Sequence, residues 1–308
     1  MNSGQGKKLL GGVIPVLSTP FTPDGAVDRE SFRALIEAAI AGGANGLAMF
    51  GLASEYYKLS EDERSGLVQV LVQQTAKRCP VVISITAHST VLAKKEAAQA
   101  AEYGADVLMI MPPFFLGPSM HAVVQHIREV AAVVRLPMIL QYAPLQTGRF
   151  IEAAVFAELS RSVPNLTHVK VDLVPSGPMV SDLCSRGVGC LVGYMGLHLP
   201  EDFFRGAAGV MPTVAVTPAL SEIWRLLSND REKARSLHQE LLPLLNFMMQ
   251  SVEFLISCEK EILFRLGVLR SSYCREPTIH LDHAQKAELD IHIARLADRL
   301  GLIKSRPI

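Results

Sequence analysis

Short apolar segments alternate with amphipathic segments eight times between the start of this chain and residue 228. The segments between the apolar ones have helical spacing, as in residues 31–43, where Ser31 can cap the first turn. Apolar strands separated by helices form a parallel sheet covered on both faces. Eight such units are the number that closes a (β/α)8 barrel, also called a TIM barrel. The predicted strands cover residues 13–17, 46–50, 81–85, 105–110, 137–142, 165–173, 190–193 and 208–213.

An open, doubly wound sheet is the alternative arrangement for this alternation. That fold binds nucleotides through a glycine-rich loop after its first strand, with the spacing GxGxxG. The loop after the first predicted strand is STPFTPDG, and the segments GVIPV and GLAMFGLAS also lack this spacing. We therefore favour the closed barrel and do not expect nucleotide binding.

The sequence changes character at about Asn229. Three amphipathic helices are predicted beyond it without strands between them, over residues 231–257, 258–269 and 281–303. We therefore expect a barrel at residues 1–228 that carries the active site, and a C-terminal three-helix appendage at residues 229–308. The Leu, Met and Phe stripes of these helices predict a packing surface against the barrel or another subunit.

Composition excludes several classes of function. The chain has 308 residues, 49% hydrophobic and 19% charged, with a formal net charge of +0. It therefore has no basic excess for nucleic acid or an anionic membrane surface, and no apolar run of about 20 residues that could span a bilayer. Its start lacks the long apolar core of a secretory signal. The five cysteines form no CxxC pair, which predicts a reducing cytoplasm and no zinc site.

One lysine lies inside the sixth predicted strand. Lys170 has Val169 and Val171 as neighbours, although lysine is among the residues least often buried. An ammonium group among valines loses hydration, which lowers its pKa and favours the neutral amine. A neutral amine can attack a ketone and form a Schiff base. The alternative interpretation is an edge position from which the amine reaches solvent.

The ends of the predicted strands are where a barrel enzyme builds its active site. Lys170 is late in its strand, and the period of two places His168 and Asp172 on the same side. If that side is the barrel interior, the amine points into a closed pocket of low dielectric constant. The residues that end the strands are Thr19, 51–55, 88–90, 113–116, 141–146, Lys170, Asp172, Gly193, Tyr194 and 211–214.

Several of these segments resemble motifs of the dihydrodipicolinate synthase and N-acetylneuraminate lyase family, which are lysine-dependent class I aldolases of pyruvate chemistry. GLASE at 51–55 stands where the family has G-T-T-G-E, and HVK at 168–170 where it has G-I-K. PPFFLGPS at 112–119 resembles P-Y-Y-N-x-P-S, and ILQYAPLQTG at 139–148 resembles I-L-Y-N-x-P-x-R-T-G. The opening GVIPVLSTPF and the segment GAAGVMP at 206–212 also match, in the family's order.

The resemblance implies a mechanism and its residues. Lys170 becomes the Schiff-base lysine for a 2-oxo acid, with no metal or organic cofactor beyond this covalent adduct. The loop after the second strand holds the substrate carboxylate, partly through backbone N–H groups at Ala53 and Ser54, and the Ser54 hydroxyl is also available. The family further implies a homotetramer, or sometimes a dimer. We expect substrate contacts from Gly51, Leu52, Ala53, Ser54, Phe115, Gln146 and Met211.

The proton relay of the family is not retained. Gln141 and Leu52 replace a tyrosine and a threonine, and Phe115 replaces a tyrosine that the neighbouring subunit supplies. None of the three can shuttle a proton at neutral pH. Gln146 replaces the arginine that holds the carboxylate of the synthase's aldehyde substrate. We therefore do not expect dihydrodipicolinate synthesis itself.

The predicted catalytic residues are Lys170, Gln141, Tyr142 and His88. Of these, Tyr142 and His88 are the candidates for the missing acid–base group. Tyr142 follows Gln141, but strand alternation points it outward unless a bulge re-aims it, and the alternative is a tyrosine packed under the helices. His88 ends the third strand and titrates near neutral pH, and the alternative is a loop histidine of no special role.

We conclude that the sequence predicts a cytoplasmic Schiff-base lyase, either an aldolase or a dehydratase, that acts on pyruvate or another 2-oxo acid. Apolar residues at the rim favour a less polar acceptor than a sugar chain, and they are Leu52, Phe114, Phe115, Leu116 and Leu145. The partners expected are this small molecule and further copies of the chain, with no nucleic acid and no membrane. The alternative function is a barrel that binds a 2-oxo acid without turnover, as a sensor or scaffold subunit.

Overall fold

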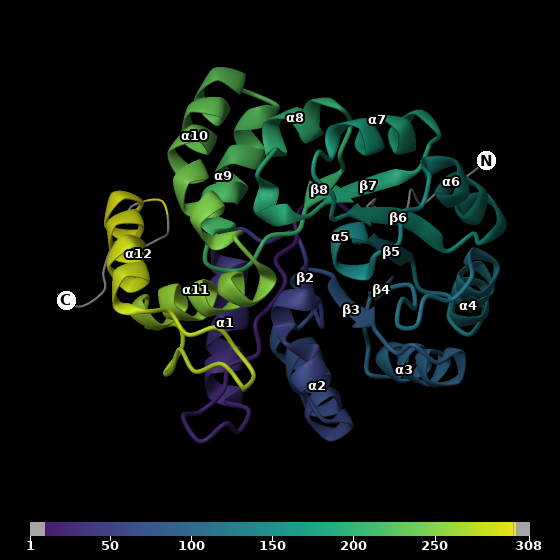
Figure 1. Cartoon of the computed structure of the whole chain (residues 1–308), viewed down its shortest axis with the longest axis horizontal. Helices are drawn as coiled ribbons and strands as arrows, with labels where there is room; N and C mark the ends of the chain where they lie inside the picture. The colour runs from purple at the N-terminus through teal and green to yellow at the C-terminus, as the bar shows by residue number, and fades with distance from the viewer. Residues whose placement is uncertain (1–9, 298, 300–308) are drawn as a thin grey trace.

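A single parallel sheet of eight strands forms the centre of the molecule (Figure 1). The computed structural model describes residues 10–297 and residue 299. The strand order is β1-β8-β7-β6-β5-β4-β3-β2, so each strand lies beside its neighbour in sequence and β1 lies beside β8. The strands are β1 (Gly12–Val13), β2 (Leu47–Met49), β3 (Val81–Ile85), β4 (Val107–Ile110), β5 (Met138–Tyr142), β6 (Leu166–Val171), β7 (Gly189–Val192) and β8 (Gly209–Val210).

The two edges of this sheet meet at Val16. This residue forms a parallel bridge with Ala48 of β2 on one side and with Thr213, just beyond β8, on the other. The sheet therefore curls into a ring of parallel strands, which confirms the predicted (β/α)8 architecture. Each strand is apolar because both of its faces are covered.

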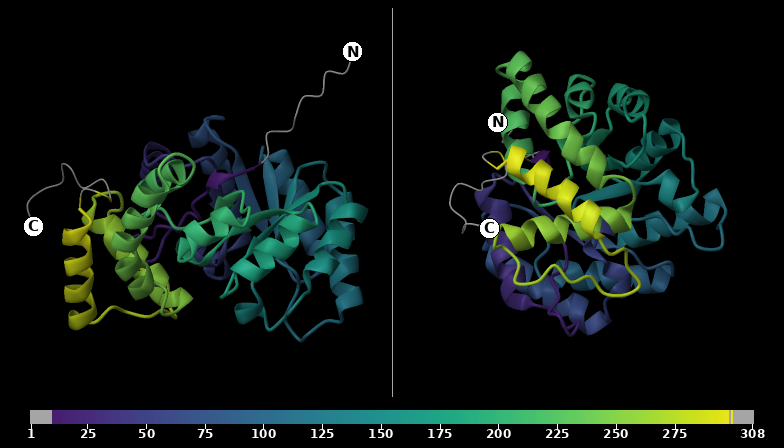
Figure 2. Two further views of the ribbon diagram at one scale, coloured as in Figure 1. Left: turned by 90° about the horizontal axis from the view of Figure 1, so that it is seen from above. Right: turned by 60° about the vertical axis from the view of Figure 1, so that its left-hand side comes forward.

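Helices follow every strand, and all but the short α5 pack on the outside of the ring (Figures 1 and 2). The short α5 (Pro144–Thr147) was not predicted, and it precedes the expected helix after β5. The others are α1 (Arg29–Ala41), α2 (Glu61–Thr75), α3 (Thr90–Glu102), α4 (Met120–Ala132), α6 (Ala153–Ser162), α7 (Gly177–Ser185), α8 (Leu199–Phe204) and α9 (Thr217–Leu227).

Side chains at the helix N-termini fix where two of these helices begin. The Ser60–Glu63 capping box predicted for α2 is present, with side-chain bonds in both directions. The predicted cap of α1 is wrong, because Asp28 accepts from the backbone N–H groups of Glu30 and Ser31. Ser31 instead lies within the helix and donates its hydroxyl to Asp28. An aspartate is as good a cap as a serine, so α1 begins one turn earlier than expected.

Three more helices follow α9, and they lie on the side of the molecule opposite α4 and α6 (Figure 1). They are α10 (Arg231–Met248), α11 (Val252–Arg265) and α12 (His283–Arg295). The predicted boundary between the first two was wrong, because Ser251 caps α11 by accepting from Phe254 N–H. The division of the chain at residue 228 stays a prediction, and residues 1–9, 298 and 300–308 of those ranges lie outside the described residues.

The helices give no simple membrane span. No single helix in the described part of the chain is long and apolar enough to cross a bilayer. Helices α10 and α11 meet that criterion only when joined, and they bend by 117° at the break between them.

Candidate active site

Lys170 points into the interior of the barrel. Its neighbours across the sheet are Gln141 of β5 and Leu191 of β7, and side chains paired in this way share one face. Leu191 belongs to the apolar cluster that fills the ring. The lysine residue is only 6% exposed. The expectation of an edge lysine in open solvent therefore does not hold.

The amine of Lys170 is not surrounded by apolar groups alone. Its Nζ lies 2.9 Å from Oδ2 of Asp172. The same carboxylate oxygen accepts a hydrogen bond from Gln141 Nε2, also at 2.9 Å. Lys170 belongs to β6 and Asp172 follows that strand directly, while Gln141 belongs to the adjacent β5, and all three side chains are nearly excluded from solvent. The three residues therefore form a connected polar group at the carboxyl end of the barrel, and we call it the Lys170–Asp172–Gln141 cluster.

A glycine makes room for this cluster. A Cβ atom on Gly193, just after β7, would overlap Asp172 Oδ1 and lie 3.5 Å from Lys170 Cε. Any larger residue would therefore displace the carboxylate. The position needs glycine for close approach of a neighbouring side chain and not for an unusual φ angle.

The amine and the Asp172 carboxylate line a cavity of about 70 Å³ at the ends of the strands. Three of its lining residues, Met249, Val252 and Leu255, come from the bend between α10 and α11. The sequence assigned those stripes to packing only, so their part in the site was missed. The lining residues from the barrel are Val16, Leu52, Ala53, Gln146, Lys170, Asp172, Tyr194, Met195, Met211, Pro212 and Thr213.

The loop after β2 lies against the first strand as well as the cavity. Gly51 packs on Val16, where a Cβ would approach Cγ1 within 2.9 Å. The hydroxyl of Ser54 donates to the Leu17 carbonyl at 2.7 Å, and its N–H donates to Gly51 O. The expected free hydroxyl of Ser54 is therefore occupied by the segment that follows β1. Leu52 and Ala53 are the loop residues that line the cavity.

Tyr142 lies on the other side of its strand, away from Lys170. Its ring packs edge-on against Phe156 of α6 at 5.1 Å, and its hydroxyl accepts from Ile151 N–H at 3.4 Å. Burial raises the pKa of Tyr142. No bulge re-aims it, because β5 and β6 stay in register from Ile139 to Tyr142. The expectation that it serves Lys170 is therefore wrong, and the packed tyrosine is correct.

His88 and Phe115 lie on the exposed rim and do not line the cavity. The ring of His88 meets the edges of Phe114 and Phe115, with centroids 4.7 and 6.1 Å away. Phe115 is 71% exposed and its neighbour Leu116 is 91% exposed. The structure therefore does not bring these two predicted residues to Lys170 within one chain.

Tyr194 was not chosen as a site residue, although it ends the seventh strand. It lines the cavity, and its hydroxyl accepts a hydrogen bond from Gln146 Nε2 at 3.3 Å. Its φ angle is 47°, a left-handed conformation that is rare for a side chain of this size. Such conformations gather at functional sites. The signal in the sequence was its position directly after Gly193 at a strand end.

His168 lies one layer below Lys170. It is buried, and its Nδ1 is 2.8 Å from Thr167 Oγ1. Burial lowers the pKa of His168, which favours the neutral ring. It therefore fills the interior without adding a charge beneath the cluster.

A network of buried charges lies behind the cavity on the side of α11. Glu55 of the loop after β2 forms ion pairs with Lys58 and with Lys260 of α11. Glu259, which precedes Lys260 in α11, accepts hydrogen bonds from Thr213 Oγ1 at 2.5 Å and from Ala215 N–H at 3.0 Å. Burial raises the pKa of Glu259 to about 7. Helix α11 therefore ties together the loops after β2 and β8, which both line the cavity.

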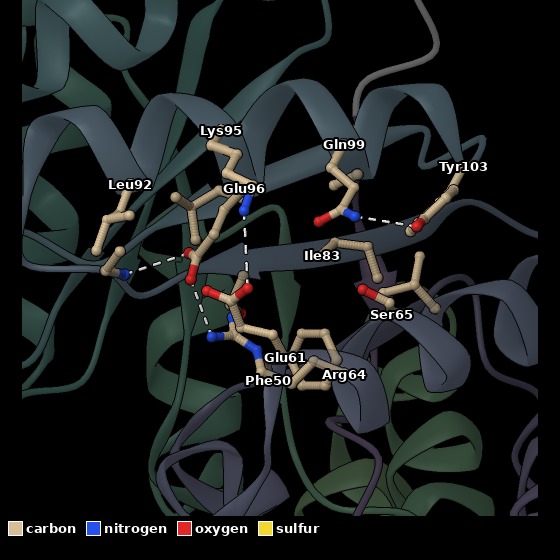
Figure 3. Close-up of a pocket in the computed structure, with 15 residues that line it drawn as sticks. Phe50, Glu61, Arg64, Ser65, Ile83, Leu92, Lys95, Glu96, Gln99 and Tyr103 are labelled. Carbon is tan, nitrogen blue, oxygen red and sulfur yellow. Dashed lines mark hydrogen bonds and ion pairs between the residues drawn. The ribbon is translucent and has the colours of Figure 1, made fainter.

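A second cavity, of about 90 Å³, lies outside the barrel between α2 and α3 (Figure 3). Arg64 donates to Glu96 at 2.9 Å, and Gln99 donates to Tyr103 at 3.0 Å. These polar groups are satisfied by one another, and Lys170 is not among the lining residues. We therefore take the smaller cavity at Lys170 as the candidate active site.

Comparison with known proteins gives one family for almost the whole chain. Residues 9–296 match the model of the "Dihydrodipicolinate synthetase family". A 4-hydroxy-tetrahydrodipicolinate synthase of Acidobacterium capsulatum is 29% identical, over 97% of this chain and 98% of its own. An L-2-keto-3-deoxyarabonate dehydratase of Azospirillum brasilense is 27% identical, over 94% and 96% of the two chains.

A solved structure with the same fold is that of YagE, a prophage protein of the dihydrodipicolinic acid synthase family from Escherichia coli K12, in complex with pyruvate. It superimposes with a TM-score of 0.86 at 25% sequence identity. The match covers 96% of this chain and 99% of the other. The C-terminal helices are thus within the region of likeness.

Proposed function

The chain belongs to the dihydrodipicolinate synthetase family, and we propose that it is a lyase that acts on pyruvate or another 2-oxo acid through a Schiff base on Lys170. One observation carries the proposal: the Lys170 amine is buried and lines a cavity at the carboxyl ends of the strands. Barrel enzymes place their chemistry at this face. A nucleophilic lysine here can reach a small ketone while bulk water is largely excluded.

The reaction would begin with attack of the Lys170 amine on the ketone carbon. Loss of the ketone oxygen as water leaves an iminium ion on the lysine. Its positive nitrogen withdraws electrons from the neighbouring carbons, so a bond one position from the former ketone can be formed or broken. Leu52 and Ala53 line the cavity, and in this proposal their backbone N–H groups would hold the substrate carboxylate.

The rest of the cavity favours a substrate with an apolar distal part. Met195 and Met211 contribute from the barrel, and Val252 and Leu255 contribute from α11. Gln146 carries no charge that could pair with a second carboxylate. We therefore propose an aldolase or dehydratase whose substrate differs from that of dihydrodipicolinate synthase. The similarity to known relatives alone does not distinguish these activities.

We also propose that the chain forms a homo-oligomer through the rim after β4, because Phe115 and Leu116 are strongly exposed there. Light scattering during gel filtration tests this. A tetramer or dimer is expected for the wild type, and Phe115→Ser with Leu116→Ser should weaken it. A wild-type monomer at assay concentrations would refute the proposal.

The test of function is a turnover panel. The protein is incubated with 2-oxo acids whose distal parts are hydroxylated, alkyl or aryl, and release of pyruvate or loss of water is followed. We expect turnover of at least one compound, with a preference for alkyl or aryl chains, and none for Lys170→Ala. Binding of 2-oxo acids without turnover of any compound would favour the sensor or scaffold alternative. The replacement of the family's relay residues by Gln141 and Leu52 is the observation that supports this alternative.

A further inference from the structure

We propose that Asp172 is the acid–base group of this site, and that Gln141 is the positioning residue that holds it. This inference rests on the proposed Schiff-base function. Asp172 Oδ2 lies 2.9 Å from Lys170 Nζ and 2.9 Å from Gln141 Nε2. It also lines the same cavity as the amine, so it can reach both the nitrogen and a bound ketone.

Neighbouring residues determine where the Asp172 carboxylate lies. Gln141 Nε2 fixes one oxygen, and Gly193 leaves the space that the other oxygen occupies. The residue is only 7% exposed. Asp172 is therefore held within contact distance of the amine, which a catalytic acid–base group requires.

Other candidates in the described residues are less well placed. The Tyr142 hydroxyl is turned to the helix layer and His88 lies on the rim. Tyr194 lines the cavity, but its hydroxyl accepts a hydrogen bond from Gln146, and among the described residues no hydrogen bond joins it to Lys170. Asp172 is the group in contact with the nucleophile itself. Gln141, which stands where the family has its relay tyrosine, thus gains a role as the support of a different acid–base group.

The proton transfers balance within this pair. The Asp172 carboxylate takes a proton from the Lys170 ammonium, and the freed amine attacks the ketone carbon. The protonated carboxyl gives that proton to the former ketone oxygen, which becomes a hydroxyl. Asp172 then takes a second proton from the nitrogen and passes it to the hydroxyl, which leaves as water. The products are the iminium ion, one water molecule and the carboxylate in its starting form.

The rate of iminium formation tests this step directly. Purified protein is mixed with pyruvate, quenched with borohydride after increasing times, and the reduced adduct is measured by mass spectrometry. We expect Asp172→Asn to slow adduct formation by about 10²- to 10⁴-fold, the usual contribution of an acid–base group. Asp182→Asn is the matched control, since that aspartate is exposed on α7 and pairs only with Arg186 among the described residues; its rate should equal that of the wild type.

Rescue by a small acid separates chemistry from structure. In Asp172→Ala, added formate should restore the rate of adduct formation in a saturable manner, because it can occupy the emptied space and carry protons. A merely structural role for Asp172 predicts no rescue. The inference is overturned by an unchanged rate in Asp172→Asn, or by the absence of formate rescue in a folded Asp172→Ala protein.

A second variant keeps the test valid if the Asp172 variants do not fold. Gly193→Ala removes no functional group, but it forces the Asp172 carboxylate to move. We expect at least about a tenfold slower adduct formation, and an unchanged rate would contradict the inference. Failure of the proposed function gives a different result: the wild type itself forms no adduct with any 2-oxo acid.

Discussion

Lys170 and Lys260 are both buried lysines with a carboxylate partner, and they differ in what else surrounds the nitrogen. Lys170 pairs with Asp172 and faces a cavity. Lys260 is fully buried, pairs with Glu55, donates to the Tyr273 carbonyl at 3.2 Å and lies over the ring of Phe21 at 4.4 Å. The amine of Lys260 therefore has protein contacts on several sides.

The difference teaches that burial and charge pairing do not identify a nucleophile. A buried ion pair contributes little net stability, because the cost of removing both charges from water offsets their attraction. Lys260 joins α11 to the loop after β2, so its role is to hold two segments of the site together. Lys170 has space for a reacting molecule beside its nitrogen. Access to a cavity, and not depth, distinguishes the reactive lysine from the structural one.

The largest effect is expected for Lys170→Ala. Turnover should fall on the order of 10⁶-fold, as it does when other covalent nucleophiles are removed. The free energy of unfolding in urea should fall less than in Lys260→Met, because Asp172 lines the cavity, where water can hydrate it, and keeps its bond to Gln141. Substantial turnover in this variant would show that Lys170 is not the nucleophile.

Lys260→Met should have the reverse pattern. It leaves Glu55 buried with Lys58 as its remaining partner, so the free energy of unfolding should fall by about 3–5 kcal/mol. The folded protein should still form the adduct at Lys170. The double variant Glu55→Gln with Lys260→Met should recover part of the stability, and equal loss in both would argue against the ion pair as the cause.

Glu259→Gln tests whether the neighbouring carboxylate makes stability depend on pH. Burial raises the pKa of Glu259 from 4.5 to about 7, so the folded state holds a proton that the unfolded state releases between these values. The free energy of unfolding should therefore fall by up to about 3 kcal/mol as the pH rises across this window.

The comparison of this variant with the wild type isolates Glu259 from other groups. Asp202, whose pKa burial raises to about 6, acts in the same direction in both proteins. The Glu259→Gln protein should therefore show a shallower decline from pH 4.5 to 7, measured by urea unfolding. Parallel curves for the two proteins would contradict the assignment.

The smallest effect is expected for an exposed lysine. Lys95 is 65% exposed and lies 3.7 Å from Glu61 across α2 and α3. Lys95→Ala should change the free energy of unfolding by less than about 1 kcal/mol, because surface pairs are screened by water. A loss as large as that of Lys260→Met would remove the distinction between buried and exposed pairs.

The sequence predicted the barrel and Lys170 for physical reasons that were local. Strand–helix alternation determined the ring of strands, and the late position of Lys170 in its strand placed it at the carboxyl end. Strand alternation also gave the outward direction of Tyr142 as one of two open interpretations. These inferences needed only the period of two and the residues that break helices.

The remaining features depend on long-range contacts that no local pattern contains. The bend at Ser251 brings Val252 and Leu255 to the cavity, beside barrel residues such as Leu52 that are far away in the sequence. The contact of Asp172 with Gln141 depends on the register of β5 and β6, and the left-handed Tyr194 depends on the turn after Gly193. The sequence shows that these residues lie at a strand end or a helix start. It does not show which residues they contact.

The most direct test is to locate the trapped adduct. The protein is treated with pyruvate and borohydride, digested, and the modified peptide is sequenced by tandem mass spectrometry. We predict a single modified lysine, Lys170, with Lys260 unmodified in the same sample. Modification of Lys260, or no adduct on Lys170 with any 2-oxo acid that the protein binds, would contradict the account.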